Sequence, residues 1–335
     1  MDSKHFLRQI RCACRLITRW LIYVGIALCS LATVLGLFGH LHWTMDLMNH
    51  MRMHIVVGTL LAVVWMIWHM QRRWFVLAFA SLVINLVIVQ PWQFYVASEP
   101  RTVTQTDSFV SLLCWNVLAS NQDTNGIVGV VRQSSPDLIV LVEYTESLAS
   151  QLDHLRKDYP FHLESPRRDA FGIAVFSRKP CKLETFRIGT GNVPCICATI
   201  GDAKNAPLRL WAAHTYPPIG EMWRFRRRQL EELSALVAAY NDVPTVVCGD
   251  LNETPWGNAF RSLIDRADLA DSSSGLGYQA SWPTMLGPLG IPIDHVLVSR
   301  DVSVIERKIV RGIAGSDHRP VFVQLAVPKD SKTAP

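Results

Sequence analysis

Apolar residues are distributed very differently along the two parts of this chain. Three long apolar runs occupy about residues 20–39, 53–70 and 74–92, and each is near the minimum length for a tilted membrane-spanning helix. A buried helical hairpin in a soluble protein is the less favoured alternative, because the runs leave no polar face for water. A cleaved signal peptide fits worse, because more spans follow the first. We predict a membrane domain over residues 1–96 with three transmembrane helices.

Shorter apolar runs, separated by polar segments, characterise the remainder of the chain. Residues 97–108 are polar and predict a linker, residues 109–327 have the size of one domain, and residues 328–335 form a polar tail. Runs typical of buried strands lie at residues 109–115, 138–142, 172–176, 195–200, 208–213, 245–248, 293–299 and 321–325. Many strands with fewer helices predict a layered α/β domain with at least one large mixed sheet.

Helical patterns are fewer in this second part. Residues 146–157 and 221–240 have helical periodicity. We expect a third helix to begin with Thr254 as its N-cap and Pro255 at its first position, where proline is well tolerated.

Charged residues around the apolar runs predict their orientation in a membrane. The basic residues that precede the first run are Lys4, Arg8, Arg11, Arg15 and Arg19, and Arg72 and Arg73 separate the second run from the third. By the positive-inside rule, the N-terminus and the turn at residues 71–73 are cytoplasmic, and everything after Pro91 lies outside. We therefore predict a multi-pass protein of a bacterial cytoplasmic membrane with an extracytoplasmic second domain. The net charge of +5 is modest and does not by itself indicate nucleic acid.

Polar residues end or adjoin several of the predicted strands. Those at strand ends are Asn116, Glu143, His214, Asp250 with Asn252, and Asp294, whereas Asp317 and His318 precede a strand. If the strands share a sheet, these residues crowd one rim and form a pocket of carboxylates, amides and imidazoles. Oxygen donors without thiolates favour Mg²⁺ or Mn²⁺ over zinc. The spacings of the cysteines also match no zinc pattern.

The motifs taken together resemble one known family. Val-Val-Cys-Gly-Asp-Leu-Asn at residues 246–252 and Gly-Ser-Asp-His-Arg-Pro at residues 315–320, preceded by the Asn, Glu and His motifs, resemble the endonuclease/exonuclease/phosphatase superfamily. That superfamily includes the deoxyribonuclease I-like nucleases. The resemblance covers about residues 109–325 and implies a four-layer α/β sandwich, in which two packed mixed β-sheets are flanked by helices. With its three preceding spans, the layout resembles membrane-anchored bacterial members.

The resemblance also implies a role for each strand-end residue. Glu143 resembles the principal Mg²⁺ ligand, Asn116 a neighbour that helps to hold metal or phosphate, and Asp317 a residue at the metal site. The implied catalytic residues are Asp250, which orients or deprotonates the attacking water, Asn252, whose amide steadies the phosphate, His318, which contacts the phosphate, Asp294, which fixes and charges that imidazole, and His214, a second phosphate-side histidine.

Two basic clusters are further candidates for binding the substrate phosphate. Arg226 and Arg227 lie in the predicted helix 221–240, and Arg168 precedes a predicted strand. These three arginines could capture phosphate at the pocket edge, whereas the alternative is a solvated face or a contact with anionic lipid. Nucleic-acid binding would need a longer basic track with stacking aromatic residues, and the sequence has no such track.

These observations predict a membrane-anchored Mg²⁺-dependent phosphohydrolase, a phosphodiesterase or phosphatase that acts on the extracytoplasmic side. A linker of about a dozen residues keeps the site within a few tens of ångströms of the bilayer, so we expect a lipid-linked or envelope phosphate as substrate. One alternative is a surface nuclease that cleaves DNA or RNA, which the lack of a basic track disfavours. Another is a non-catalytic membrane module that binds a phosphorylated ligand, which the intact metal-binding and water-activating positions disfavour.

Overall fold

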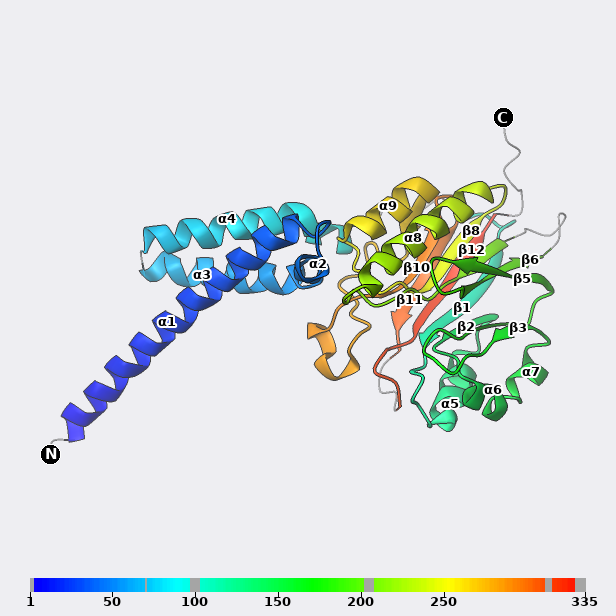
Figure 1. The fold of residues 1–335 in the computed structure, drawn as a ribbon, viewed down its shortest axis with the longest axis horizontal. Coiled ribbons are helices and arrows are strands. Elements are labelled where there is room, and N and C mark those ends of the chain that lie inside the picture. The colour runs from blue at the N-terminus through cyan, green and yellow to red at the C-terminus, as the bar shows by residue number, and fades with distance from the viewer. Residues whose placement is uncertain (1–2, 70, 97–102, 202–207, 311–314, 329–335) are drawn as a thin grey trace. The chain divides into compact units, whose positions relative to one another are not determined.

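The computed structural model describes all residues except 1–2, 70, 97–102, 202–207, 311–314 and 329–335. The chain divides into two compact units, Met1–Pro91 and Trp92–Pro335 (Figure 1). Residues 97–102 of the predicted linker and residues 329–335 of the predicted tail lie outside the described residues.

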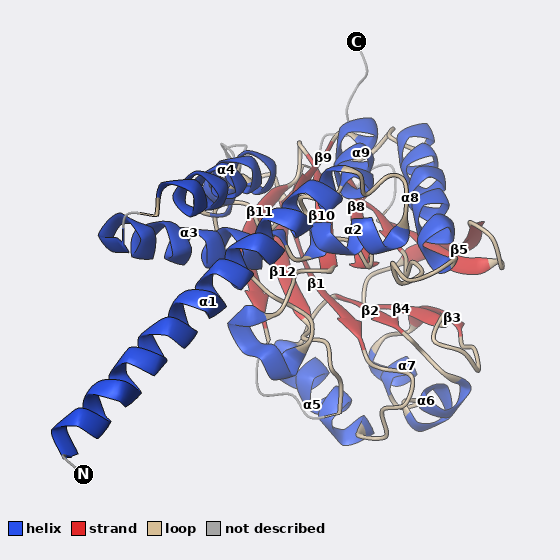
Figure 2. Cartoon of the chain, turned by 60° about the vertical axis from the view of Figure 1, so that its left-hand side comes forward, coloured by secondary structure: helices blue, strands red, loops and turns tan. Residues whose placement is uncertain are grey.

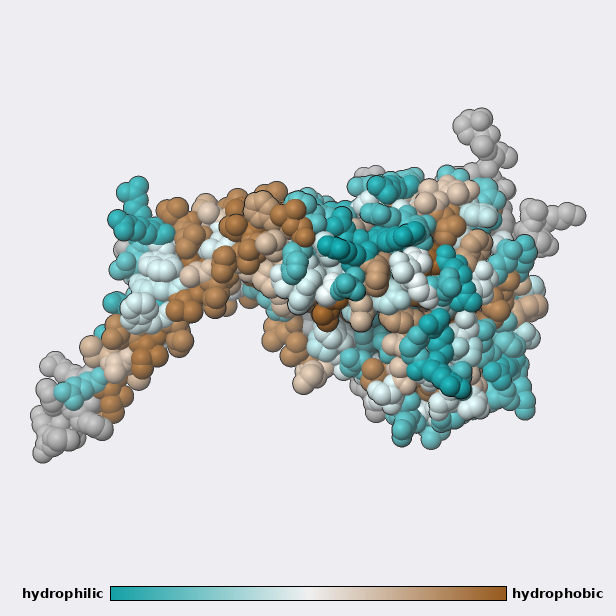
Figure 3. All heavy atoms as spheres, in the orientation of Figure 1, coloured by the Kyte–Doolittle hydropathy of each residue, from teal (hydrophilic) through white to brown (hydrophobic). Residues whose placement is uncertain are grey.

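The first unit is helical. It contains α1 (Ser3–Leu37), α2 (Trp43–His50), α3 (Arg52–His69) and α4 (Arg72–Val89). By length and composition, three helical stretches could cross a membrane, namely Gln9–Leu37, Arg52–His69 and Arg72–Val89. The structure differs from the prediction in that α1 begins well before residue 20 and the segment between the first two spans contains α2. Figure 3 shows the brown, apolar side chains that these helices expose.

Polar side chains join the helices inside this unit. Asn85 on α4 donates a hydrogen bond from Nδ2 to Oγ1 of Thr33 on α1 at 2.8 Å, and accepts one from Nη1 of Arg52 on α3 at 2.8 Å. Ser81 on α4 donates to Oγ of Ser30 on α1 at 2.9 Å. All five side chains are buried. These bonds pair buried polar groups with one another between the helices.

The second unit is a sandwich of two six-stranded mixed sheets (Figure 2). The strand order of the first sheet is β11 (Ser303–Ile309), β12 (Val321–Val327), β1 (Ser108–Asn116), β2 (Leu138–Val142), β4 (Ile173–Ser177), β3 (Phe161–Ser165). The order of the second is β5 (Cys181–Ile188), β6 (Val193–Ile200), β7 (Leu208–Ala212), β8 (Thr245–Asp250), β10 (Asp294–Ser299), β9 (Leu269–Asp271). Each sheet contains one parallel pair, β1 with β2 and β7 with β8.

Helices cover the outer face of each sheet. Those on the first sheet are α5 (Thr124–Ser134), α6 (Glu146–Gln151) and α7 (Leu155–Asp158), and those on the second are α8 (Met222–Ala239) and α9 (Asn258–Ala267) (Figure 2). A core of small and branched apolar side chains fills the space between the two sheets. The predicted four-layer α/β sandwich is therefore confirmed.

Burial on both faces explains why the central strands appear as continuous apolar runs in the sequence. In β1, Leu112 and Cys114 face the core between the sheets, whereas Leu113 and Trp115 pack against the helices. Successive side chains of a strand point to opposite faces, so a strand covered on both sides is apolar throughout. After the unbroken apolar stretch from Leu112 to Trp115, the next side chain is that of Asn116, which β1 thereby delivers to the rim of its sheet.

The helices differ from prediction in two places. Residues 146–157 form the two short helices α6 and α7 rather than one. The prediction that Thr254 caps a helix is wrong, because Thr254 is buried in a turn and α9 begins only at Asn258. Trp256 lies between Thr254 and Asn258, and its side chain is buried and packs edge-on against Phe94. This segment therefore packs into the interior and does not form a helix.

The division between the two units falls earlier in the chain than the predicted end of the membrane domain. Gln93 and Phe94 lie in the short 3₁₀ helix η1 (Pro91–Phe94). The N–H of Gly275 donates to the carbonyl of Gln93 at 3.2 Å, and the N–H of Gly277 donates to that of Phe94 at 2.5 Å. These hydrogen bonds make the chain from Trp92 onward part of the second unit.

Candidate active site

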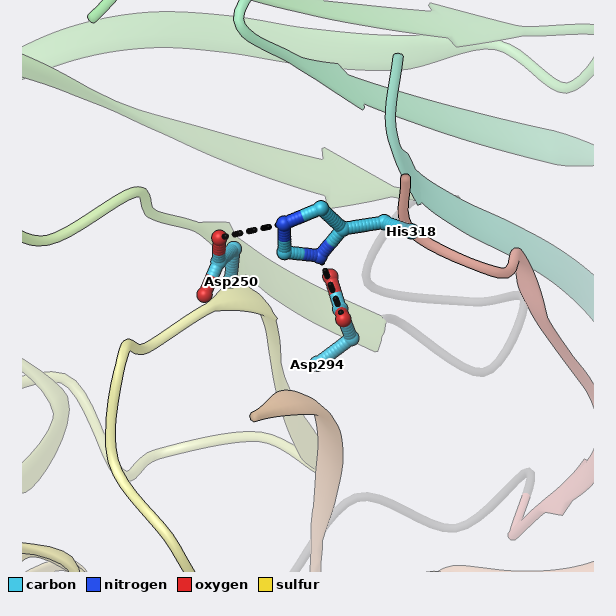
Figure 4. A group of neighbouring side chains, drawn as sticks. All are labelled: Asp250, Asp294 and His318. Atoms are coloured by element: carbon cyan, nitrogen blue, oxygen red, sulfur yellow. Dashed lines mark hydrogen bonds and ion pairs between the residues drawn. The ribbon is translucent and has the colours of Figure 1, made fainter. Parts of the chain in front are cut away.

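Three titratable side chains from both sheets meet at one rim of the sandwich (Figure 4). Asp250 is the last residue of β8, and Asp294, the first of β10, is its partner in the antiparallel register. His318 directly precedes the segment that enters β12 in the other sheet. Ligand-type atoms of the three residues all lie within 4.8 Å of one another, and all three side chains are buried. The structure thus brings together residues that lie far apart in the sequence.

His318 and Asp294 form a buried ion pair. Nδ1 of His318 is 2.8 Å from Oδ2 of Asp294, and its Nε2 is 3.7 Å from Oδ2 of Asp250. Burial alone would lower the pKa of His318, but the two carboxylates outweigh burial and raise the pKa to about 10. Burial also opposes ionisation of Asp294, yet the charge of His318 brings its pKa below the usual value. At neutral pH the pair is therefore an imidazolium and a carboxylate.

Asp250 receives hydrogen bonds on both carboxylate oxygens. Its Oδ1 accepts from the N–H of Asn252 at 2.9 Å, and its Oδ2 accepts from Nδ2 of Asn116 at 3.0 Å. Nε2 of His214 lies 3.6 Å from the same Oδ2. Burial, followed by the negative charge of Asp294, raises the pKa of Asp250. A carboxylate with a raised pKa accepts a proton more readily, which suits a general base.

One amide links Glu143 to this cluster. Nδ2 of Asn116 donates to Oε1 of Glu143 at 2.9 Å as well as to Asp250. The parallel register pairs Asn116 with Val142, which places Glu143 just beyond the same sheet edge. Glu143 has a φ of 59°, which non-glycine residues seldom adopt, and its Oε2 accepts from the N–H of Ala119 at 2.8 Å. The hydrogen bonds hold this carboxylate in one orientation.

The predicted metal ligands carry the oxygen donors that fit a hard divalent cation. By distance, Asp250, Asp294 and His318 could also share a metal ion, but a protonated His318 has no lone pair to offer as a ligand. Glu143 supplies carboxylate oxygens, and Oδ1 of Asp317 is buried without a hydrogen-bond partner among the described residues. Carboxylate and amide oxygens are the ligands that Mg²⁺ prefers in proteins. A metal role for the predicted ligands is therefore compatible with their chemistry.

Two residues that the sequence did not single out support the site from a loop. Nε1 of Trp282 donates to Oδ2 of Asp317 at 2.9 Å, and its ring lies 6.2 Å from that of His318. Oγ of Ser281 accepts a hydrogen bond from the N–H of Asp294 at 3.1 Å. The sequence carried no signal for either residue, because both reach the site through a loop and not from the end of a predicted strand.

Asn252 and His214 lie at the edge of the cluster. Nδ2 of Asn252 donates to the carbonyl of Thr215 at 2.9 Å, and its φ is 47°. Nδ1 of His214 is buried and has no hydrogen-bond partner in the described part of the chain, and its ring lies 5.4 Å from that of Phe171. Both residues contact Asp250, so the structure brings them to the predicted site. Their roles toward a phosphate stay predictions.

The three arginines proposed for phosphate binding occupy different environments. Arg226 is fully buried, and its Nη2 is 3.2 Å from Oε2 of Glu253. Arg226 is therefore not exposed at a pocket edge, because its face of α8 turns to the interior, and a phosphate role for it stays a prediction. Arg168 is largely exposed, and its Nε lies 3.3 Å from Oε2 of the exposed Glu146. The guanidinium of Arg227 lies over the ring of Trp223, 5.2 Å from its centroid. A phosphate role for these last two stays a prediction.

Fold and site together define the class of protein. Two packed mixed sheets that bring carboxylates, amides and imidazoles to one rim are the framework of a metal-dependent phosphoric ester hydrolase. The chain belongs to the Endonuclease/Exonuclease/phosphatase family, whose model matches residues 113–318.

Solved structures share the fold of the second unit. An endonuclease/exonuclease/phosphatase from Bacteroides vulgatus has a TM-score of 0.55 at 18% identity, and the match covers 66% of this chain and 99% of that chain. One from Beutenbergia cavernae has a TM-score of 0.52 at 19% identity over 65% of this chain and 72% of that chain. TDP2 from D. rerio, complexed with single-strand DNA product, has a TM-score of 0.53 at 16% identity over 65% and 99%. These identities establish the fold alone. No curated protein matches the chain significantly.

Proposed function

We propose that this protein is a Mg²⁺-dependent phosphohydrolase anchored in a bacterial cytoplasmic membrane, with its catalytic unit on the extracytoplasmic side. The observation that carries the proposal is the buried His318–Asp294 pair beside Asp250, in a chain with three helices long and apolar enough to span a membrane. Family membership supports the hydrolysis of phosphoric esters. The basic residues around the first and third spans support the orientation.

The proposed chemistry assigns a separate task to each member of the cluster. Asp250 takes a proton from the attacking water, since its pKa is raised by burial. His318 donates a hydrogen bond from Nε2 to a phosphate oxygen, and its positive charge offsets the negative charge that develops there. Asp294 keeps His318 charged and fixes its ring. Asn252 and His214 contact the phosphate from the edge of the cluster.

Glu143 and Asp317 are the residues that would hold a divalent cation, with Asn116 beside them. A bound Mg²⁺ supplies positive charge to the oxygens of the phosphate. Asn116 fixes the separation between Glu143 and Asp250, because its amide donates to both carboxylates. These hydrogen bonds keep Glu143, which would hold the cation, at a fixed distance from Asp250, which activates water.

We propose a lipid-linked or envelope phosphate ester as the substrate. Only residues 90–92 separate the end of α4 from Gln93, which is bonded to the second unit. A short tether keeps a site close to the bilayer and raises the effective concentration of lipid-borne substrates. Location therefore supports a lipid phosphate more strongly than it supports a soluble one.

Nuclease activity is a second candidate. It is favoured by the fold shared with D. rerio TDP2, which was solved with single-strand DNA product. Single-strand binding normally uses a basic groove with aromatic residues on which bases stack. The candidate arginines give little support for such a groove, because Arg226 is buried against Glu253. We therefore rank a DNA or RNA substrate second.

Phosphate release by the purified full-length protein in detergent tests the proposal. The substrate panel is a polyprenyl pyrophosphate, a sphingomyelin-like lipid and DNA, each with Mg²⁺ or with EDTA. We expect hydrolysis of a lipid phosphate and its loss in EDTA. Preferential cleavage of DNA would favour the nuclease. Binding of these ligands by a folded protein without any hydrolysis would favour a non-catalytic module.

Reporter fusions test the proposed orientation separately. A reporter fused after Ser98 should register as extracytoplasmic, and one fused at Arg73 as cytoplasmic, because the basic residues favour that arrangement. A cytoplasmic signal at Ser98 would overturn both the three-span topology and the envelope substrate.

A further inference from the structure

An uncharged loop beside the site exposes apolar side chains that have no task in the proposed chemistry. We call residues 272–293 the apolar loop, because no charged residue occurs in it. Its short 3₁₀ helix η2 (Thr284–Leu289) exposes three large apolar side chains. Met285 is 88% exposed, Leu286 48% and Leu289 64%. Neighbouring exposed apolar side chains of this kind mark a surface that contacts another protein, a ligand or a membrane.

The apolar loop has a fixed backbone. Trp282 and Ile291 exchange two backbone hydrogen bonds at its base, at 3.0 and 2.6 Å. Nη2 of Arg319 donates to the carbonyl of Thr284 at 3.0 Å. In Figure 1 the loop is the yellow-orange segment that projects from the catalytic unit, and apolar atoms are seen at the corresponding place in Figure 3. The side chains of η2 are therefore held outward by the structure around them.

Further apolar side chains are exposed where the chain enters the second unit. Trp92 is 51% exposed and Tyr95 70%, and Leu276 in the apolar loop is 48% exposed. The hydrogen bonds that Gly275 and Gly277 donate to residues 93–94 join this entry segment to the loop. Tryptophan and tyrosine are enriched where proteins meet the membrane–water interface. The composition of the combined surface therefore fits the interfacial region of a bilayer.

Chain connectivity limits how far the apolar loop can lie from the end of a candidate span. α4 ends at Val89, and Gln93 accepts a hydrogen bond from the loop residue Gly275. Four residue steps extend no further than about 14 Å, whatever orientation the two units adopt. If α4 crosses the bilayer, the loop is thus within reach of the interface.

We propose that the apolar loop, together with Trp92 and Tyr95, inserts into the surface of the bilayer and holds the catalytic site against the lipid. The proposal rests on the proposed membrane anchoring and deepens it by naming the contact surface. Trp282 at the base of the loop donates to the side chain of Asp317, and the N–H of Thr284 donates to the carbonyl of Asp317 at 2.8 Å. Insertion of η2 therefore places the site at the level of lipid phosphates.

Photocrosslinking in lipid nanodiscs tests the insertion without relying on activity. A benzophenone amino acid replaces Met285 in the full-length protein, and the control carries it in place of Phe109. Phe109 is 49% exposed and lies at the opposite end of β1 from the site residue Asn116. We expect lipid adducts at position 285 in at least about tenfold excess, the factor by which burial of one large apolar side chain favours insertion. Equal adduct yields at the two positions, or a covalent dimer from position 285 in place of a lipid adduct, would overturn the proposal.

Hydrolysis provides an independent readout. The double substitution Met285→Ser with Leu289→Ser should lower turnover of a phosphate lipid in vesicles by about tenfold or more. Turnover of the soluble diester bis(p-nitrophenyl) phosphate should not change, and Phe109→Ser should affect neither substrate. Equal losses on both substrates, or no loss on either, would overturn the docking role. If the unsubstituted protein hydrolyses neither substrate, the proposed function fails and the crosslinking result alone decides the insertion.

Discussion

Two buried ion pairs in the catalytic unit are alike in burial and differ in their surroundings. Arg226 and Glu253 are 0% and 1% exposed, and His318 and Asp294 are 5% and 1% exposed. In the first pair, one guanidinium faces one carboxylate at 3.2 Å. In the second, one imidazolium faces two carboxylates, because Asp250 lies 3.7 Å from Nε2 of His318.

The excess of carboxylates over cations around the His318–Asp294 pair is what suits this pair to catalysis. A matched buried pair satisfies its own charges, and breaking it by removing one partner is strongly unfavourable. A cluster with one cation and two carboxylates can take up a proton or a further cation without first breaking a matched pair. Burial alone therefore does not distinguish the two pairs, whereas the balance of charge around them does.

The largest effect should come from the carboxylate that unbalances the cluster. Asp250→Asn keeps the shape of the site but removes the proton acceptor, so turnover of the phosphate ester should fall by about 10²–10⁴-fold. Added Mg²⁺ should not restore it. Initial rates of phosphate release measure the effect, and circular dichroism checks the fold. A loss of less than about tenfold would show that Asp250 is not the base.

Substitutions in the His318–Asp294 pair should reveal that its members act as a unit. Asp294→Asn and His318→Asn should give similar losses of turnover, because one removes the carboxylate that orients and stabilises the imidazolium and the other removes the imidazolium itself. The double variant should lose much less than the sum of the two single losses in free energy. Strictly additive losses would reduce Asp294 to a structural residue at the start of β10.

The same pair predicts the direction of a pH shift. In the proposed reaction His318 acts in its protonated form, so activity should be lost as the pH rises through its pKa of about 10. Asp294→Asn removes an anion that stabilises the imidazolium and thus lowers this pKa. The basic limb of the pH–rate profile should therefore move to lower pH. An unmoved limb would mean that His318 does not supply the charge.

A smaller and reversible effect is expected at Glu143. Glu143→Ala should weaken Mg²⁺ binding, so the loss of turnover should diminish as the Mg²⁺ concentration is raised. Asp250→Asn is the matched control, because it should show no such recovery. Titration of turnover against Mg²⁺ for both variants separates the two roles. Recovery of both variants, or of neither, would contradict the division between cation binding and water activation.

The central strands could be predicted from the sequence, whereas the edge strands could not. β2 and β8 are buried on both faces and therefore appear as unbroken apolar runs. In β5 and β11, partly or fully exposed residues predominate, so neither strand contains such a run. The strand-end residues Asn116, Glu143 and Asp250 followed from the central strands. This is why the residues at the rim of the site could be predicted, whereas the edge strands of the sheets could not.

The rest of the site depends on contacts that no local pattern encodes. Helical periodicity shows which side chains of α8 share a face, but it does not show which face meets the sheet. For this reason the sequence predicts Arg226 at the pocket edge, although its partner Glu253 follows the strand-end residue Asn252 directly. Ser281 and Trp282 belong to the site only through the hydrogen bonds that join their loop to Asp294 and Asp317.

The smallest effect on turnover is expected from the matched pair. Arg226→Met leaves Glu253 as a buried charge without its ion-pair partner, which should cost about 3–5 kcal/mol of stability. The double variant Arg226→Met with Glu253→Gln should recover much of that loss, because no charge then remains at the pair. Turnover per folded molecule should change less than in Asp294→Asn, since neither side chain carries the proton or the charge of the proposed reaction. Denaturant unfolding of the full-length protein in detergent, with rates corrected for the folded fraction, measures both quantities. Unchanged stability combined with a loss of turnover as large as that of Asp294→Asn would remove the distinction between the two pairs.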